Sequence, residues 1–299
     1  MFQLPRQAII NLNESKGNIL SNSKAFIVQL SKINPPRLTI ITPSYNQATF
    51  LERTIDSVLS QGHPNLEYMI VDGGSKDGSV DIIRKYERHL AWWVSEADRG
   101  QVHAINKGIE RATGVWVGWQ NSDDIYLPGA LAVAASLQSR LPDHTGVLAG
   151  AMLMVDAADQ PLRELRYVTP TFRSLRAEGM VIANQSTWWR RSLHGAVGFL
   201  NEQYDCSFDY DWFLRLLGHT KAYYIDKTLG ALRLHGETKT SSLAHKFTEQ
   251  NEEILRHFGS PSQFERRAYQ LRRALRTLAN GHLTYLLRGR RARSALNAK

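Results

Sequence analysis

The sequence of 299 residues contains a single cysteine, Cys206, and no long apolar stretch. One cysteine excludes an intrachain disulfide and is typical of a reducing compartment. The longest apolar run, residues 147–155, is much shorter than the roughly 20 residues that a membrane-spanning helix needs. The first residues lack the basic-then-apolar pattern of a secretory signal. We therefore expect a cytoplasmic protein, either free or peripheral on the inner face of the cytoplasmic membrane.

Two common nucleotide-binding signatures are also missing. No GxGxxG fingerprint follows the first β-rich segment, where residues 42–46 read TPSYN, and the chain has no Walker phosphate loop. These absences argue against dinucleotide-dependent hydride transfer and against P-loop phosphate chemistry. A glycine-rich, lysine-containing loop after the first strand is absent too, which argues against a nucleotidyltransferase.

The formal net charge of +9 comes from one segment. Residues 263–299 contain ten Lys or Arg and one acid, so the remaining 262 residues are formally neutral. A neutral remainder argues against a nucleic-acid partner. Two interpretations of the basic tail stay open: a helix docked on the rest of the chain, or residues 262–299 bound to an anionic membrane surface. The tail has apolar residues at helical spacing, namely Phe264, Ala268, Leu271, Leu275 and Leu278.

Strand and helix patterns alternate four times from Arg37 onward. This alternation predicts an α/β fold in which a mostly parallel, Rossmann-like sheet is flanked by helices. The predicted strands are residues 37–41, 66–72, 91–96 and 115–120. The predicted helices are residues 49–61, 77–90, 101–113 and 128–140.

The second half of the chain is less regular. We predict a strand at 146–156, a strand or strand-to-helix corner at 183–191, a helix at 208–219 and an extended segment at 221–236. The chain thus divides into a lead-in, a catalytic domain of two halves and a basic helical tail. The predicted bounds are 1–36 for the lead-in, 37–140 and 141–258 for the two halves of the 37–258 domain, and 259–299 for the tail.

Polar clusters follow the predicted parallel strands at their carboxyl ends. Such ends meet at one edge of a sheet, where α/β proteins bind ligands. Tyr45 offers a flat face to a base or ribose, and Asp72 can accept hydrogen bonds from either. The adjacent carboxylates of Asp123 and Asp124 can hold Mn²⁺ or Mg²⁺ through hard oxygen ligands. A nucleotide attached to another group fits these residues.

Four segments, in this order and at this spacing, closely resemble the family 2 nucleotide-sugar glycosyltransferases, which have the GT-A fold. The resemblance covers residues 37–240. It implies inverting transfer of a sugar from a nucleoside diphosphate, with UDP as the commonest nucleotide, to a glycan or lipid-linked acceptor. The four segments are TIITPSYNQATFLERTIDSVLSQ, EYMIVDGGSKDGS, SEADRGQVHAINKGIERATG and WQNSDDIYLPGAL.

The resemblance also assigns roles to individual residues. It implies Asp124 as the primary metal ligand, Asp123 as a ribose or metal partner, and His235 as a further metal ligand or a structural histidine. Ser122 stands where many relatives carry another acid. The implied nucleotide-sugar-binding residues are Pro43, Tyr45, Asn46, Asp72, Ser75, Asp98, Gly100, Gln101, Asn106 and Lys107.

The general base is expected at the start of the 208–219 helix. The segment CSFDYDWFLRL resembles the acidic helix start of the family, although Phe208 replaces a Glu there. This alignment makes Asp209 the base and Asp211 its neighbour. The alternative is that Asp209 only caps the helix and Asp211 or Glu202 is the base.

Residues 184–188 are candidates for the acceptor side. Asn184 and Gln185 could bind an acceptor sugar, and Trp188 is either its stacking platform or a core aromatic. The resemblance places the whole reaction in cell-surface polysaccharide biosynthesis. Because Phe208 departs from the family pattern, a catalytically altered nucleotide-sugar-binding protein of the same fold stays the alternative.

Overall fold

The computed structural model describes residues 35–138, 140–236 and 243–282. Residues from Pro36 onward belong to one compact unit, and its described part is the subject here. The predicted lead-in 1–36 lies almost wholly outside the described residues, as does the end of the basic tail. The domain bounds stay predictions, but residues on both sides of position 140 contribute strands to one sheet.

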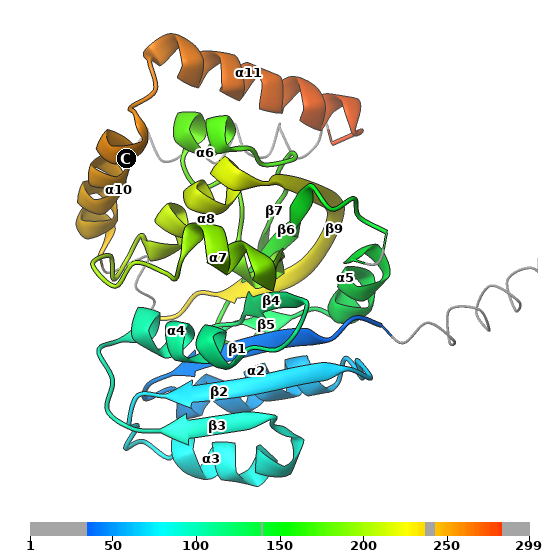
Figure 1. The fold of residues 1–299 in the computed structure, drawn as a ribbon, viewed down its shortest axis with the longest axis vertical. Helices are drawn as coiled ribbons and strands as arrows, with labels where there is room; N and C mark the ends of the chain where they lie inside the picture. Colours follow the sequence, from blue (N-terminus) through cyan, green and yellow to red (C-terminus); the bar gives the residue numbers. More distant parts are fainter. Residues whose placement is uncertain (1–34, 139, 237–242, 283–299) are drawn as a thin grey trace, which may run out of the picture. The chain divides into compact units, whose positions relative to one another are not determined.

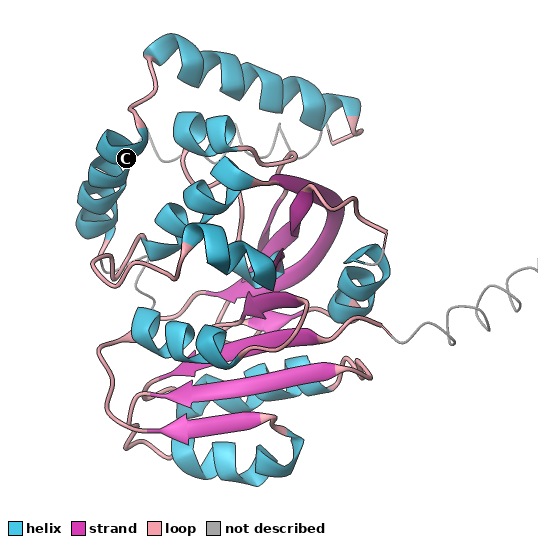
Figure 2. Ribbon diagram, viewed as in Figure 1, coloured by secondary structure: helices cyan, strands magenta, loops and turns pink. Residues whose placement is uncertain are grey.

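Within the described residues, nine strands form this sheet in the order β3-β2-β1-β4-β8-β6-β9-β5, with β7 paired to β6 (Figure 1). The strands are β1 (Leu38–Ser44), β2 (Leu66–Asp72), β3 (Trp92–Ser95), β4 (Trp116–Trp119), β5 (Ile125–Tyr126), β6 (Thr145–Val155), β7 (Pro161–Leu165), β8 (Thr187–Arg190) and β9 (Lys221–Arg233). Figure 2 shows the helices on both faces of the sheet.

The α-helices are α2 (Ala48–Leu59), α3 (Ser79–Tyr86), α4 (Gln101–Arg111), α5 (Ala130–Gln138), α6 (Phe172–Glu178), α7 (His194–Val197), α8 (Phe208–His219), α10 (Ala244–Phe258) and α11 (Gln263–Ala279). Short 3-10 turns are η1 (Glu87–His89), η2 (Asn184–Ser186) and η3 (Arg191–Leu193). The helix predicted over 208–219 is confirmed. The helix predicted over 128–140 starts later, at Ala130, because Pro128 and the left-handed Gly129 precede it.

The predicted parallel sheet is confirmed in the first half of the chain. Strand β1 pairs in parallel with both β2 and β4, and β2 pairs in parallel with β3. The second half is mixed, since β8 is antiparallel to β4 and β6 while β6 and β9 are parallel. The carboxyl ends of β1, β2 and β4 therefore lie together at one sheet edge.

The central strands are apolar on both faces because helices cover both. Successive residues of β1 point to opposite sides. Ile40 packs in a cluster with α2, α3 and α5, whereas Ile41 packs in a second cluster with α4, α6 and α8. This double burial explains the near-continuous apolar runs of these strands.

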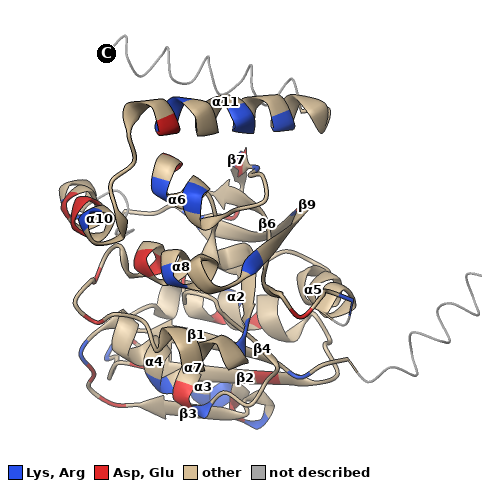
Figure 3. Cartoon of the chain, turned by 45° about the horizontal axis from the view of Figure 1, so that its top comes forward, with Lys and Arg blue, Asp and Glu red and all other residues tan. Residues whose placement is uncertain are grey.

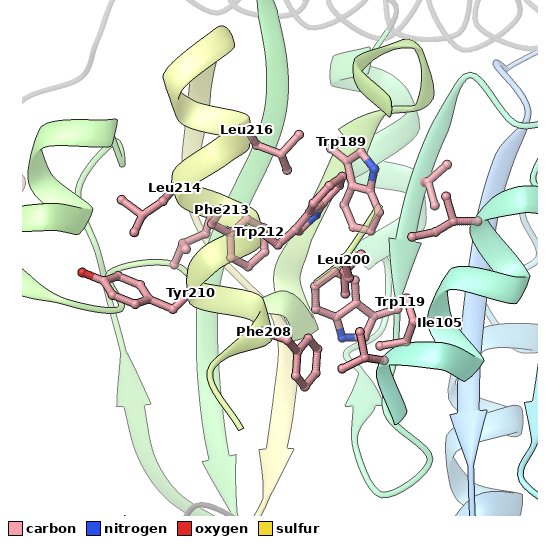
Figure 4. Close-up of a cluster of buried hydrophobic side chains, with 14 of the residues drawn as sticks. Ile105, Trp119, Trp189, Leu200, Phe208, Tyr210, Trp212, Phe213, Leu214 and Leu216 are labelled. Atoms are coloured by element: carbon pink, nitrogen blue, oxygen red, sulfur yellow. The ribbon is translucent and has the colours of Figure 1, made fainter. Parts of the chain in front are cut away.

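Helix α8 holds the second cluster together through aromatic side chains (Figure 4). The rings of Trp119 and Trp189 lie 5.3 Å apart, and Phe213 and Trp212 of α8 pack against them at 6.0 and 5.6 Å respectively. Trp119 ends strand β4, so the first turn of α8 is held next to the carboxyl end of that strand. Phe208, at the first position of α8, also contacts Trp119.

We predict that Gly230→Ala strongly destabilises the fold. A Cβ at this position of β9 would lie 1.8 Å from the backbone oxygen of Gln185, so η2 would have to move. We expect a loss of about 3 kcal/mol or more in the free energy of unfolding, measured by urea denaturation. Gly195→Ala is the control, because a Cβ there meets open space in α7. Equal stability of the two variants would contradict this packing.

Candidate active site

A cavity of about 700 Å³ opens at the carboxyl ends of the parallel strands. Its lining comes from the loops after β1, β2, β3 and β4 and from β6, η2, α8 and β9. Ten of the predicted site residues line it: Pro43, Tyr45, Asp98, Gly100, Gln101, Asp123, Asp124, Asn184, Gln185 and Asp209. The structure thus brings together residues that are separated by more than 160 positions in the sequence.

Tyr45 and the start of α4 present ligand-binding groups to the cavity. The Tyr45 side chain is 63% exposed, which leaves a ring face free for stacking. Asp98 accepts a hydrogen bond from the Gly100 backbone N–H at 2.7 Å, at the N-terminus of α4. Helix N-termini attract anions such as phosphate. Gln101 extends this edge by donating to Asn121 at 2.9 Å.

Asp72 organises the loop after β2. Its side chain is fully buried and accepts hydrogen bonds from the backbone N–H groups of Gly74 and Ser75 and from the hydroxyls of Ser75 and Ser95. Asp72 and Ser75 are absent from the cavity lining. Their contact with a nucleotide stays a prediction, and the structure gives both a role in shaping the loop.

Three further predicted donor-site residues make structural contacts. Asn46, in the left-handed conformation, accepts from the Lys76 N–H and donates its own N–H to Ser75. Asn106 makes two hydrogen bonds with the backbone of Leu200, and Lys107 pairs with Glu96 at 2.7 Å. None of these three residues lines the described cavity, so their nucleotide-sugar contacts stay predictions.

The two adjacent carboxylates have different surroundings. Asp124 is fully buried and accepts hydrogen bonds from the Asn121 amide (2.9 Å), the Gln185 amide (2.8 Å) and the Arg233 backbone N–H (3.0 Å). Burial and the neighbouring Asp123 raise the pKa of Asp124 well above its usual range, against the lowering effect of these donors. These three hydrogen bonds hold the Asp124 carboxylate in place.

Asp123 has the more accessible carboxylate. Its side chain is 22% exposed, lines the cavity and lies 3.1 Å from Nε2 of His235. The His235 ring also packs on Phe50, with the ring centroids 4.4 Å apart. Both carboxylates line the cavity, Asp123 is the more exposed of the two, and the predicted metal contacts of Asp124, Asp123 and His235 stay predictions.

Arg233 was not predicted, yet it fixes the position of this pair. Its guanidinium is completely buried, donates to the Asp123 backbone oxygen, and pairs with Asp159 at 2.7 Å. It also lies over the Phe50 ring, 5.0 Å from the centroid. Arg233 and His235 stand in RLHG, but no sequence pattern indicates that Asp159 lies opposite.

The side chains near Asp123 can be compared with the ligands that a divalent cation usually has in proteins. Among the described residues no three His, Cys, Asp or Glu side chains form a metal-binding group. Mg²⁺ and chemically similar ions commonly use one or two carboxylates, with substrate phosphates and waters supplying the remaining ligands. Asp123 beside His235 meets this smaller requirement, so the residues present fit a cation bound together with a diphosphate.

The two acids of α8 face different surroundings. Asp209 lines the cavity and is half-buried, and burial raises its pKa to about 6. Asp211 is buried and forms an ion pair with Arg215, with contacts of 2.7 and 2.9 Å. It lines a separate cavity beside Tyr204 and Phe258. Glu202 is paired with Arg99 at 2.8 Å. Of the three candidate bases Asp209, Asp211 and Glu202, the lining of the main cavity includes Asp209, and its role as the base stays a prediction.

The acceptor prediction is wrong for Trp188 and stays open for its neighbours. The Trp188 side chain is fully buried in the core and stacks on Tyr126 at 5.6 Å, so it cannot stack on a ligand. Asn184 and Gln185 of η2 both line the cavity. Gln185, however, uses its amide to bind Asp124.

Three buried polar atoms of the cavity lining have no hydrogen-bond partner within the described part of the chain: Ser44 Oγ, Trp119 Nε1 and Asn184 Nδ2. Buried polar groups normally have partners, because leaving them unpaired is unfavourable. All three atoms belong to residues that line the same cavity and are themselves buried.

An apolar wall was also missed by the sequence predictions. It faces the polar strand ends and is formed by Met152, Tyr167, Met180, Ile182, Phe208, Leu232 and Phe247. These residues come from several elements that only the folded chain brings together, and apolar residues scattered in this way carry no local signal.

Comparison with known sequences identifies related proteins. Residues 39–178 match the sequence profile described as glycosyl transferase family 2. An uncharacterized glycosyltransferase of Rickettsia felis is 26% identical over 256 residues, which covers 77% of this chain. This chain spans only 41% of that relative. The putative teichuronic acid biosynthesis glycosyltransferase TuaG of Bacillus subtilis is 43% identical over 94 residues, 30% of this chain and 36% of TuaG.

Comparison with solved structures confirms the fold. TarS of S. aureus, in complex with UDP-GlcNAc, aligns with a TM-score of 0.59 at 16% identity, over 78% of this chain and 69% of the TarS chain. The mannosyltransferase PcManGT of Pyrobaculum calidifontis, in complex with GDP-Man and Mn²⁺, gives a TM-score of 0.55 at 18% identity, over 88% and 81%. Both are GT-A proteins, so the predicted fold class is confirmed.

We predict that Asp124→Ala destabilises the fold more than Asp123→Ala does. The first change leaves three buried donors without an acceptor, at about 1–3 kcal/mol for each unsatisfied group. The second removes a partly exposed carboxylate, and we expect a loss within about 1 kcal/mol. Urea denaturation of both variants measures the difference. Equal losses would show that Asp124 is not the structural member of the pair.

Proposed function

We propose that this chain, which carries a glycosyltransferase family 2 domain with the GT-A fold, transfers a sugar with inversion. The donor is a nucleoside-diphosphate sugar, with a UDP-sugar favoured, and the acceptor is a hydroxyl of a glycan or lipid-linked molecule. The observation that carries this proposal is the cavity whose lining includes both Asp123 and Asp209. The donor class is supported by the ligands named for TarS and PcManGT.

Asp209 is the general base in this proposal. It accepts the proton of the acceptor hydroxyl while that oxygen forms a bond to the anomeric carbon of the sugar. The bond from that carbon to the diphosphate oxygen breaks, and its electron pair leaves with the nucleoside diphosphate. With its pKa raised to about 6, Asp209 is a stronger base than an ordinary aspartate and is still ionised near neutral pH.

The polar wall positions the donor. Tyr45 stacks on the base or ribose, and the N-terminus of α4 at Gly100 directs backbone N–H groups to the diphosphate. Ser44, Trp119 and Asn184 offer polar atoms that have no partner among the described residues. Fixing the donor and the acceptor in line removes much of the entropic barrier to the reaction.

Asp123 and His235 are the side chains that we assign to Mn²⁺ or Mg²⁺. When bound, such a cation neutralises the charge that develops on the leaving diphosphate. Asp124 takes the supporting role, because its three hydrogen bonds hold the loop that carries Asp123. The complex of PcManGT with Mn²⁺ supports a metal requirement.

The names of the relatives support a role in cell-surface polysaccharide synthesis. TuaG is named for teichuronic acid biosynthesis, and a hyaluronan synthase of Pasteurella multocida shares 29% identity over 218 residues. The alternative, a nucleotide-sugar-binding protein without transfer activity, is disfavoured because Asp209 faces the cavity without an ion pair among the described residues.

We predict that chelation of the metal stops donor turnover and that added Mn²⁺ restores it. Asp123→Ala is expected to need at least about tenfold more Mn²⁺ for half-maximal activity, because one of the few protein ligands is lost. Sugar transfer or donor hydrolysis, followed by released nucleoside diphosphate, gives the measurement. Asp143→Ala, at a fully exposed acid outside the cavity lining, is the control. An unchanged Mn²⁺ requirement in Asp123→Ala would refute the metal assignment.

We predict that Asp209→Asn keeps donor binding and lowers transfer by about 10²–10⁴-fold, the usual contribution of a positioned base. In the unchanged protein kcat/KM should fall as the pH drops below about 6, because protonation of Asp209 removes the base. Donor binding is measured by calorimetry and transfer by product formation.

Asp211→Asn is the matched comparison within the same helix. It leaves the Arg215 guanidinium without its carboxylate and should lower the free energy of unfolding by about 1–3 kcal/mol. Transfer by the protein that stays folded should persist. A loss of transfer in Asp211→Asn with full activity in Asp209→Asn would assign the base to Asp211.

A further inference from the structure

Helix α11 presents apolar side chains to solvent. Phe264, Leu271, Leu275 and Leu278 are 81%, 61%, 57% and 42% exposed. Their spacings of seven, four and three residues place them along one face of the helix. A stripe of four large exposed apolar residues is unfavourable in water and is typical of an interaction surface.

The opposite, polar face of α11 attaches the helix to the rest of the compact unit. Glu265 pairs with Arg176 at 3.3 Å, Arg273 pairs with the buried Glu178 at 3.0 Å, and Thr277 is buried. This orientation is the reverse of an ordinary surface helix, whose apolar face covers the core. The helix is thus docked on the rest of the chain, which is one of the two interpretations that the sequence left open, and its attachment runs through polar side chains while the apolar stripe stays exposed.

Basic side chains flank the apolar stripe. Arg267 lies on one side of it, Arg272 and Arg276 lie on the other, and all three are exposed. The helix contains one acid, Glu265, which is held in its ion pair with Arg176. Figure 3 shows basic positions in blue along α11. The exposed side of the helix thus combines apolar surface with three arginines, and the one acid, Glu265, is 42% exposed and paired with Arg176.

We propose that α11 binds the surface of an anionic membrane. The apolar stripe enters the boundary between headgroups and acyl chains, and the flanking arginines contact lipid phosphates. The helix lies in the plane of the surface, and no helix among the described residues is long and apolar enough to span a bilayer. This inference does not depend on the transfer reaction.

The positive charge beside the apolar stripe favours an anionic membrane over a second copy of the chain as the partner of α11. Two copies that met through this face would bring the same arginines close together, with no acid on the face to neutralise them. An anionic lipid surface instead supplies negative charge on both sides of the stripe. The surface and the helix are therefore complementary in both polarity and charge.

The test is sedimentation of the full chain with vesicles of phosphatidylcholine alone or mixed with phosphatidylglycerol. We expect binding to the mixed vesicles that weakens as salt increases. Leu271→Ser combined with Leu275→Ser should lower the partition coefficient by about tenfold or more, because apolar surface is removed. Arg267→Gln combined with Arg272→Gln should lower binding to the mixed vesicles and reduce its dependence on salt.

Leu162→Ser is the matched control, because Leu162 of β7 is 56% exposed but lies outside the stripe. It should bind vesicles like the unchanged protein, and thermal unfolding should confirm that all variants fold. Vesicle binding that survives Leu271→Ser with Leu275→Ser would overturn the proposal. So would an absence of vesicle binding together with a dimer that these two changes dissociate.

Discussion

The buried carboxylate of Asp124 is the constraint on which the site depends. A carboxylate without solvent needs hydrogen-bond donors, and this one receives them from Asn121, Gln185 and the Arg233 backbone. The three donors belong to the loop after β4, to η2 and to the end of β9. Satisfying one side chain therefore fixes three segments that are distant in sequence, and these segments form much of the cavity wall.

A second buried charge supports the first. The Arg233 guanidinium is held by Asp159, by the Asp123 backbone oxygen and by the Phe50 ring. Removing one partner of such a network leaves the other charge buried and unpaired, which is strongly unfavourable. The network thus keeps the peptide of Asp123 in place while its carboxylate stays at the cavity. In the function that we propose, the adjacent acids divide their roles in this way, with Asp124 supporting the fold and Asp123 contacting the ligand.

Much of this arrangement could be predicted from the sequence, because short continuous segments carry the patterns that predict the strands and helices. Alternating strand and helix patterns predict the parallel strands β1 to β4, and parallel strands must place their carboxyl ends at one edge. The partners of individual polar groups are not local. Arg233 meets Asp123 across 110 residues, and Asp72 accepts hydrogen bonds from its own loop and from Ser95 of β3. A strand-end pattern identifies the residues that converge but not the hydrogen bonds that each one makes.

The two acids of α8 are a case in which helical geometry narrows the possible contacts, even though the sequence does not identify their hydrogen-bond partners. Residues two apart on a helix point in nearly opposite directions, so Asp209 and Asp211 cannot both face one cavity. The direction is set by the aromatic residues of the same helix. Because Phe208 and Phe213 pack on Trp119, at the end of β4, Asp209 faces the cavity and Asp211 turns toward Arg215. The apolar wall that removes water from Asp209, and so raises its pKa, includes Phe208 itself. The residue that departs from the family pattern therefore belongs to the apolar surroundings of the acid that we propose as the base.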